Sequence, residues 1–364
     1  MMRVYGCKIS YYTGKLETYL RYRSIQYDYS PTVGNERKLI AGAGVVQMPV
    51  VQLDDDRWMT DTTPMIAFLE SEQRDAQTIY PKNPVLKLAA LLIEDYADEW
   101  LWRPAMHYRW SYRPDRRYAA ESLYNDLIAG NRPMPRFLAV RILTRRQLGS
   151  FVHGDGVTPK TRDHVDRTYL TALDLLQAIF ERRPFVLGDS PTIADFGLMG
   201  PMLRHFGQDP TPAEIMRTRA PAVYEWVARM WNAKSPTSEP ELIEDIDDVL
   251  ADLLLEVSET HLAQLRQNAQ AYSDNLARYD QTIQNCHYVQ VPTSRYRVWC
   301  LEELRRAWEE LDDSSGEILQ ARLTSSAASI LWDDTPFSPS NYDTERQAPF
   351  NKAINVFGRG VPPR

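Results

Sequence analysis

The chain has 364 residues, 43% of them hydrophobic and 25% charged, with a formal net charge of −7. This length and composition predict about two domains with sizeable cores, and the acidic balance argues against a general nucleic-acid-binding surface. No apolar run approaches the ~18 residues of a membrane-spanning helix, and no signal-type apolar segment opens the chain. Three cysteines cannot form a disulfide framework and suit a reducing compartment, so we expect a cytoplasmic protein.

The sequence pattern of residues 1–75 predicts a compact α/β domain. Its strands and helices are expected in the order β-α-β-α-β-β-α. Its first four elements are a strand at Arg3–Gly6, a helix from Lys15 to about Ser24, a strand at Ile25–Tyr29, and a short helix or loop at Lys38–Gly44. Two antiparallel strands follow, and a helix then begins near Pro64 with Asp61 or Thr62 as its cap. The predicted unit is of thioredoxin-like type.

The stretch GVVQMPVVQLDDDRWMTDTTPMIA, at 44–67, is the most informative part of this unit. Pro49 interrupts an apolar run, and a proline cannot donate to a central strand ladder, so it belongs at an edge, a bulge or a turn. Two interpretations remain open on the pattern alone. One is an edge strand of a β-hairpin, and the other is a cis-proline that holds a backbone edge open for a peptide-like ligand.

Residues 4–70 resemble the N-terminal domain of the glutathione transferase superfamily. VYGCKISYYTGKLETYLRYRSIQYDY is similar to the first strand, catalytic turn, first helix and second strand of that family, and QMPVVQLDDDRWMTDTTPMIAFLE to its cis-proline strand pair and next helix. The resemblance implies that Met48 offers its backbone to the cysteinyl part of glutathione and that Asp61 and Thr62 hold the γ-glutamyl end. The implied glutathione-binding residues are Gln47, Met48, Pro49, Asp61 and Thr62.

The same resemblance locates the catalytic turn at SYYT, residues 10–13. A hydroxyl that donates to the glutathione sulfur, together with the positive end of the first helix, lowers the pKa of the thiol. Ser10 is the first candidate for that donor, with Tyr11, Tyr12 and Thr13 as alternatives, and Ser10 also suits a purely structural helix cap. The proline that usually follows the catalytic residue is replaced by Tyr11.

Residues 84–235 predict an all-helical domain. Its second helix region is aromatic, and by resemblance Trp102, His107 and Tyr108 line the pocket for the electrophile, although the same residues also suit helix packing or a dimer interface. The superfamily contains a sequence element that is similar to residues 183–202, RPFVLGDSPTIADFGLMGPM. In this element Thr192 and Asp195 form a capping box. We expect this element to serve folding rather than catalysis. The resemblance extends over residues 1–235.

Residues 236–364 predict a mainly helical extension that ends in an irregular tail rich in Pro, Asn and Asp. Tyr296–Leu311 has the periodicity of an amphipathic helix, and the tail from Trp332 is expected to wrap the surface or to be partly mobile. Cys286-His287 has no second pair at ligand spacing, so no metal site is predicted.

Two functions follow from these features. The first is a glutathione transferase that uses glutathione as cosubstrate and directs its thiolate at hydrophobic small molecules, aromatic ones included, by conjugation, ether or halide cleavage, or isomerisation. The second is a binding or scaffold protein of the same fold that has lost catalysis. In either case we expect a homodimer that neither binds nucleic acid nor spans a membrane.

Overall fold

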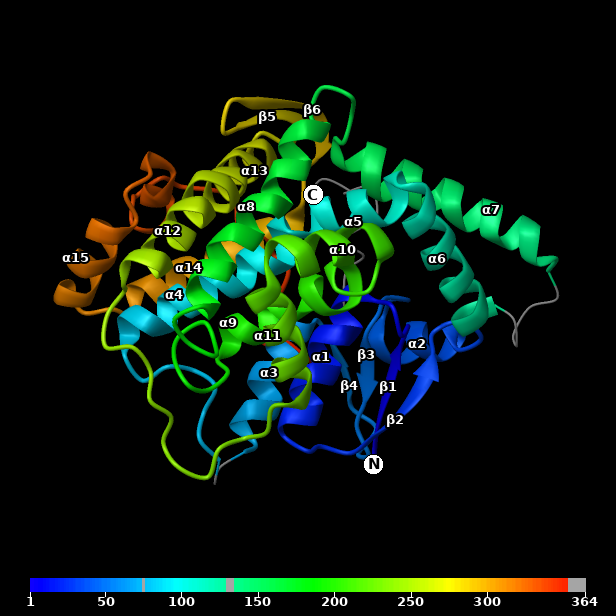
Figure 1. The fold of residues 1–364 in the computed structure, drawn as a ribbon, viewed down its shortest axis with the longest axis horizontal. Helices are drawn as coiled ribbons and strands as arrows, with labels where there is room; N and C mark the ends of the chain where they lie inside the picture. The colour runs from blue at the N-terminus through cyan, green and yellow to red at the C-terminus, as the bar shows by residue number, and fades with distance from the viewer. Residues whose placement is uncertain (74–75, 129–133, 353–364) are drawn as a thin grey trace.

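The computed structural model describes residues 1–73, 76–128 and 134–352. The N-terminal domain forms one four-stranded sheet with strand order β2-β1-β3-β4, in which β1 runs parallel to β2 and antiparallel to β3 (Figure 1). Its elements are β1 (Met2–Gly6), α1 (Tyr11–Tyr22), β2 (Tyr27–Pro31), α2 (Glu36–Ala43), β3 (Val50–Gln52), β4 (Trp58–Thr60) and α3 (Thr62–Ser71). The predicted element order and the thioredoxin-like layer are confirmed.

Two boundaries in this domain differ from the sequence prediction. Helix α1 begins at Tyr11 rather than at Lys15, because Ser10 has extended backbone and its side chain accepts from the Thr13 N–H as an N-cap. Strand β2 begins at Tyr27, two residues later than predicted, because Ser24 ends the preceding helix with a positive φ of 57°.

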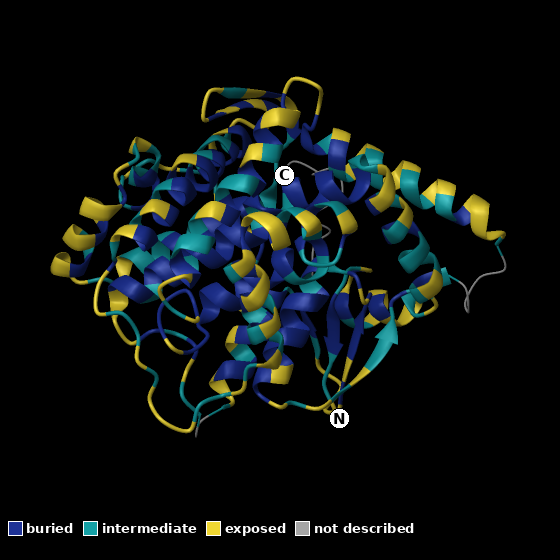
Figure 2. Ribbon diagram, viewed as in Figure 1, coloured by how far each residue is buried: buried dark blue, intermediate teal, exposed yellow. Residues whose placement is uncertain are grey.

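An all-helical domain follows, as predicted. It consists of α4 (Pro84–Asp95), η1 (Tyr96–Trp100), α5 (Trp102–Ser111), α6 (Arg113–Leu123), η2 (Tyr124–Ile128), α7 (Arg136–Gln147), η3 (Leu148–Val152), η4 (His153–Asp155), α8 (Arg162–Phe180), α9 (Ile193–Pro201), η5 (Met202–Phe206), α10 (Pro210–Arg219) and α11 (Pro221–Asn232). Helices α4, α8 and α9 lie among the buried residues at the centre of the molecule, whereas α7 projects from it with most of its surface exposed (Figure 2).

The capping box at the start of α9 is confirmed. Asp195 is fully buried and accepts from the backbone and hydroxyl of Thr192, from the Val186 N–H and from the Trp226 indole N–H. Because four donors converge on this one side chain, it joins the 183–192 loop, α9 and α11, and its role is structural.

The extension contains a β-hairpin that the sequence analysis did not predict in full. Its elements are α12 (Asp248–Val257), η6 (Ser258–Leu262), α13 (Ala263–Ser273), β5 (Arg278–Ile283), β6 (Cys286–Pro292), α14 (Arg295–Glu309), α15 (Asp313–Arg322) and η7 (Ser326–Leu331). Helices α12, α14 and α15 pack against α4 of the preceding domain (Figure 1).

The described part of the tail lies against the N-terminal domain. The backbone N–H of Thr60, on edge strand β4, donates to the carbonyl of Pro349 at 3.0 Å. The Phe350 ring packs edge-on against Phe68 of α3 at a centroid separation of 4.8 Å. The tail therefore wraps the surface up to residue 352.

None of the helices in the described residues is long and apolar enough to cross a membrane.

A buried ion cluster joins the N-terminal domain to the helical domain. The ammonium of Lys15, on α1, has no exposed surface and contacts Glu94 of α4, Asp98 of η1 and the Thr63 hydroxyl of α3. Burial acts to lower the pKa of Lys15, but the charges of Asp98 and Glu94 outweigh it and raise the pKa. Lys15 is therefore charged, and it holds the starts of α1 and α3 against α4.

We expect Lys15→Met to lower the free energy of unfolding by about 3–5 kcal/mol, because it leaves two buried carboxylates without their counter-ion. Urea denaturation at pH 7 measures the change. Lys82→Met is the matched control: Lys82 pairs with Glu239 where both side chains are more than 60% exposed, so its loss should cost less than about 1 kcal/mol. Equal effects of the two substitutions would contradict this role of Lys15.

Candidate functional site

The sheet register brings the three predicted site segments to one end of the sheet. Tyr5 of β1 pairs with Val50 of β3, and Val50 pairs with Thr60 of β4. The turn that follows β1, the residues that precede β3 and the residues that follow β4 therefore lie side by side. These are the segments with Ser10, with Met48 and Pro49, and with Asp61.

The Met48–Pro49 peptide bond is cis, as the resemblance implies. The ladder of β3 begins only at Val50, and Pro49 itself is buried. Neither the N–H nor the C=O of Met48 makes a hydrogen bond to any residue that the structure describes. A free backbone edge of this kind suits an extended, peptide-like ligand. Gln47, just before it, is half-buried.

Asp61 has the least usual conformation in the site. Its φ is +70°, which is rare for a residue other than glycine, and residues held in this region cluster at functional sites. It occupies the N-cap position of α3, as predicted, although its side chain makes no capping hydrogen bond. Thr62, which follows, is buried as the first residue of α3.

Asp61 is half-buried, and its carboxylate is incompletely paired. Its Oδ2 atom has no hydrogen-bond partner within residues 1–73, 76–128 and 134–352. Burial raises the pKa of Asp61 to about 6, and the Tyr296 hydroxyl and the Lys15 charge oppose that rise. The Oδ2 atom therefore lacks a hydrogen-bond donor or a positive charge beside it.

The four hydroxyls of the 10–13 turn have different surroundings. Tyr11 is fully buried and donates to the Ala97 carbonyl, and Tyr12 donates to the Asp98 carbonyl at 3.0 Å. Burial raises the pKa of both phenols well above the usual value. The Thr13 side chain is fully buried beside Gly6. Ser10, at the N-terminus of α1, is half-exposed, and so is Tyr12.

The three residues predicted to line an electrophile pocket separate into two groups. Trp102 stacks on Tyr12 at 5.7 Å and meets the Tyr11 ring edge-on, so it adjoins the 10–13 turn. His107 and Tyr108 are buried in the core of the helical domain. His107 contacts Ser111 at 2.8 Å and Asp166 at 3.2 Å, and Tyr108 stacks on Tyr112 at 5.2 Å. Their packing accounts for both as core residues.

Several residues at this site were not predicted. Arg109 of α5 donates to the carbonyl of Ile9 at 2.7 Å and pairs with the buried Asp209, and so fixes the residue before Ser10. Glu99 of η1 faces Tyr12 and Asp61, and burial raises its pKa to about 7 although Arg297 opposes the rise. The acidic and aromatic residues at 96–102 are the sequence signal that could have indicated Glu99. That signal does not show which side chains point inward.

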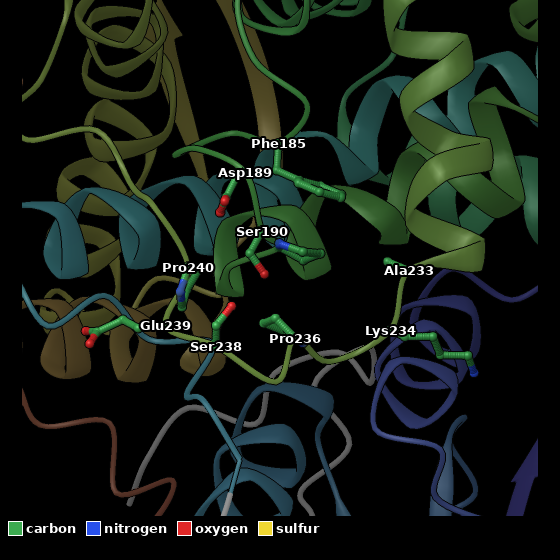
Figure 3. Close-up of a pocket in the computed structure, with 10 residues that line it drawn as sticks. Phe185, Asp189, Ser190, Ala233, Lys234, Pro236, Ser238, Glu239 and Pro240 are labelled. Carbon is green, nitrogen blue, oxygen red and sulfur yellow. The ribbon is translucent and has the colours of Figure 1, made fainter.

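A pocket of about 250 Å³ lies elsewhere, between the 185–191 loop and the linker that leads into the extension (Figure 3). Asp189, Ser190, Lys234 and Glu239 are among its lining residues, and none of the predicted glutathione-binding residues contributes to it.

Comparison with known proteins supports the class that the fold and site define, a thioredoxin-like domain followed by a helical domain. The family model described as "Glutathione S-transferase, N-terminal domain" matches residues 4–77, and that described as "Glutathione S-transferase, C-terminal domain" matches residues 159–229. The chain belongs to the glutathione S-transferase superfamily. No curated protein matches the chain significantly.

The chain is also similar in part to several solved structures. Glutathione transferase F7 from Populus trichocarpa is 15% identical with a TM-score of 0.41, and the alignment covers 63% of this chain and 93% of that one. Beta-etherase LigF from Sphingobium sp. strain SYK-6 is 12% identical with a TM-score of 0.46, covering 63% and 94%. A glutathione S-transferase from Xanthobacter autotrophicus Py2 is 20% identical with a TM-score of 0.39, covering 63% and 92%.

The raised pKa of Asp61 predicts a stabilising substitution at the site. The pKa of Asp61 is about 6 in the folded protein, against an ordinary value of 3.8. Between these two pH values the native state therefore binds more protons than the unfolded chain. The contribution of Asp61 to the free energy of unfolding therefore falls as the pH rises from about 4 to 6 and stays low above that range.

Asp61→Asn removes the buried charge, and Asn tolerates a positive φ. We expect the variant to be more stable than the wild type by about 2 kcal/mol at pH 8, with the difference vanishing below about pH 4. Urea denaturation at several pH values measures this. Asp55→Asn, at an exposed turn carboxylate, is the control and should show no such pH-dependent gain. A wild type more stable than Asp61→Asn at pH 8 would refute the prediction.

Proposed function

We propose that this protein binds glutathione and activates its thiol for attack on a hydrophobic electrophile. The observation that carries the proposal is the buried Oδ2 of Asp61, which lacks a partner among the described residues and adjoins the unpaired backbone of Met48. An ammonium group beside Asp61 supplies the missing donor and a compensating charge. Glutathione carries such a group at its γ-glutamyl end and two peptide units behind it.

The groups of the site suit the successive parts of the tripeptide. The γ-glutamyl ammonium would pair with Asp61, and its carboxylate would face the free N–H groups at the start of α3, beside Thr62. The cysteinyl unit would make antiparallel hydrogen bonds with Met48, next to Pro49 and Gln47. These contacts orient the thiol toward the end of β1, where α1 begins.

Ser10 is the group that we propose acts on the sulfur. Its hydroxyl is half-exposed, and the N–H groups of Tyr11 and Tyr12 behind it are in the first turn of α1, where they have no helical acceptor. A hydroxyl donor and a helix N-terminus both stabilise the thiolate over the thiol. The thiolate then attacks the electrophilic carbon, a C–S bond forms, and the displaced group leaves with the bonding pair. Trp102 would offer an aromatic face to a flat substrate.

A second function, binding or scaffolding without catalysis, is favoured by one specific observation. The Tyr11 and Tyr12 hydroxyls are already engaged with carbonyls of η1, and Ser10 Oγ already accepts from Thr13 N–H at 3.4 Å. The Ser10 proton is still available as a donor, which is why we prefer the enzyme. The two functions share glutathione binding and differ in turnover of a generic aromatic electrophile.

The remaining predictions stay proposals. They are the domain limits 1–75, 84–235 and 236–364, a homodimer, and a cytoplasmic location.

Glutathione binding is the first test. The wild type should be retained on immobilised glutathione, and free glutathione at ~10 times its Kd should stabilise it by about 1.4 kcal/mol. Asp61→Asn should lose retention although it folds more stably, because it cannot accept an ammonium as an ionised partner. The proposal would be refuted if the wild type were not retained on immobilised glutathione and were not stabilised by millimolar glutathione.

Catalysis by Ser10 is the second test. Ser10→Ala should lower kcat by roughly 100-fold, as loss of one stabilising donor typically does, and raise the pKa of the bound thiol, with little change in glutathione Kd. Thiolate absorbance against pH measures the thiol pKa. Ser10→Gly separates the two roles, because glycine caps a helix nearly as well but has no hydroxyl. Unchanged kcat in both variants would exclude Ser10 and leave Tyr11, Tyr12 or Thr13 as the donor.

A further inference from the structure

A second pocket, of about 370 Å³, lies in the C-terminal extension. Its walls are the end of α14, which contributes Arg305, Trp308 and Glu309, and the segment at 331–336 around the end of η7. None of the residues of the candidate glutathione site contributes to it. The volume is at the small end of the range for pockets that hold a small organic molecule.

Two tryptophans form an aromatic wall of this pocket. The centroids of the Trp308 and Trp332 rings are 4.8 Å apart, with 34° between the ring planes. Both residues are half-exposed, and no lysine or arginine among the described residues stacks on either ring. The rings contact each other, so a ligand meets them from the pocket side. The face of an indole ring attracts a cation more strongly than that of any other side chain.

The charges of the lining favour a cation as well. Three carboxylates, those of Glu309, Asp333 and Asp334, stand against the one guanidinium of Arg305. Glu309 and Asp334 are exposed, and neither carboxylate has an ion pair or a hydrogen bond to any residue that the structure describes. Glu309 is also the last residue of α14, and the C-terminal end of a helix carries a partial negative charge.

Arg305 is committed to the structure of the pocket itself. Its Nε donates to the Ile330 carbonyl at 2.7 Å, its Nη1 to the Thr335 carbonyl at 3.0 Å, and its Nη2 to the Asp333 carboxylate at 3.0 Å. The guanidinium also stacks on the Phe337 ring at 5.1 Å. These contacts fix the segment after η7 against α14, so the walls are formed before any ligand arrives, and Asp333 balances the charge of Arg305.

We propose that this pocket binds a small organic ammonium ion of the quaternary or tertiary class. The alkyl groups of such an ion pack on Trp308 and Trp332, and its charge faces Glu309 and Asp334. A quaternary ammonium has no N–H to satisfy, so an aromatic wall beside unpaired carboxylates meets all its needs. The excess of negative charge favours this ligand over a neutral ring compound such as a sugar. The inference is independent of glutathione binding.

The first test compares choline with its neutral isostere, in which a tert-butyl group replaces the trimethylammonium group. Calorimetry on the full chain at pH 7 and constant ionic strength measures both affinities. Choline should bind saturably and roughly tenfold more tightly than the isostere, because only choline gains the cation–π and ionic contributions. Absence of saturable choline binding, or equal affinity for the two compounds, would overturn the inference.

The aromatic wall is tested with Trp332→Phe, which keeps a ring at the site but weakens its attraction for a cation. Choline affinity should fall several-fold, whereas affinity for the isostere should change little. Trp231→Phe is the matched control, at a half-exposed tryptophan of α11 that stacks on Arg21 and lies outside the pocket. Its choline affinity should equal that of the wild type, and an equal loss in both variants would contradict the location.

The carboxylates are tested with the double variant Glu309→Gln, Asp334→Asn, at two exposed positions where the fold should tolerate the change. Choline affinity should fall by roughly threefold, as expected for exposed charge pairs. Glu310→Gln is the control, at the next residue, which pairs with Lys87 and does not line the pocket. Unchanged choline affinity in both Trp332→Phe and the double variant would overturn the inference, as would an equal loss in Glu310→Gln.

Discussion

The buried ammonium of Lys15 is the constraint on which the rest of this structure depends. It lies where α1, α3, α4 and η1 meet, and it is the one cation that contacts both Glu94 and Asp98 among the described residues. Two carboxyl groups share one ammonium at this junction, and burial raises the pKa of Asp98 well above its usual value, which favours its protonated form. The same cluster sets the start of α3 through Thr63, two residues after Asp61. The contact that joins the two domains therefore also fixes the helix start that follows Asp61.

The π-helical turn η1 connects that junction to the candidate site. A π turn widens the helix between α4 and α5, and such turns occur often at functional sites. Here the carbonyls of Ala97 and Asp98 accept from the Tyr11 and Tyr12 hydroxyls, so the two phenols serve as anchors of the 10–13 turn against the helical domain. Arg109 holds the same turn from its other side through the Ile9 carbonyl. Ser10, which is half-exposed, lies between these anchors.

Local patterns in the sequence predicted the fold well because they depend on neighbours in the chain. The order of the elements and the Thr192–Asp195 capping box are of this kind, whereas the cis-proline followed only from the family resemblance. Strand β5 was missed because Gln281 faces inward and breaks the apolar alternation, and because its tight turn places Gln284 and Asn285 at φ of 46° and 63° without the usual glycine. Lys15 was read as an ordinary helix residue because buried lysines are rare, and its partners lie far along the chain. The ion pair of Arg297 with Glu99 joins two domains and has no local signal at all.

The Oδ2 atom of Asp61 is costly to leave unpaired. It is buried without a hydrogen-bond partner among the described residues, and burial raises the pKa of the carboxylate, so the ionised form is unfavourable in the free protein. The same burial strengthens any ion pair formed there, because the local dielectric constant is low. A site that is destabilising when empty and strongly attractive to an ammonium is what selective binding of a zwitterionic peptide requires.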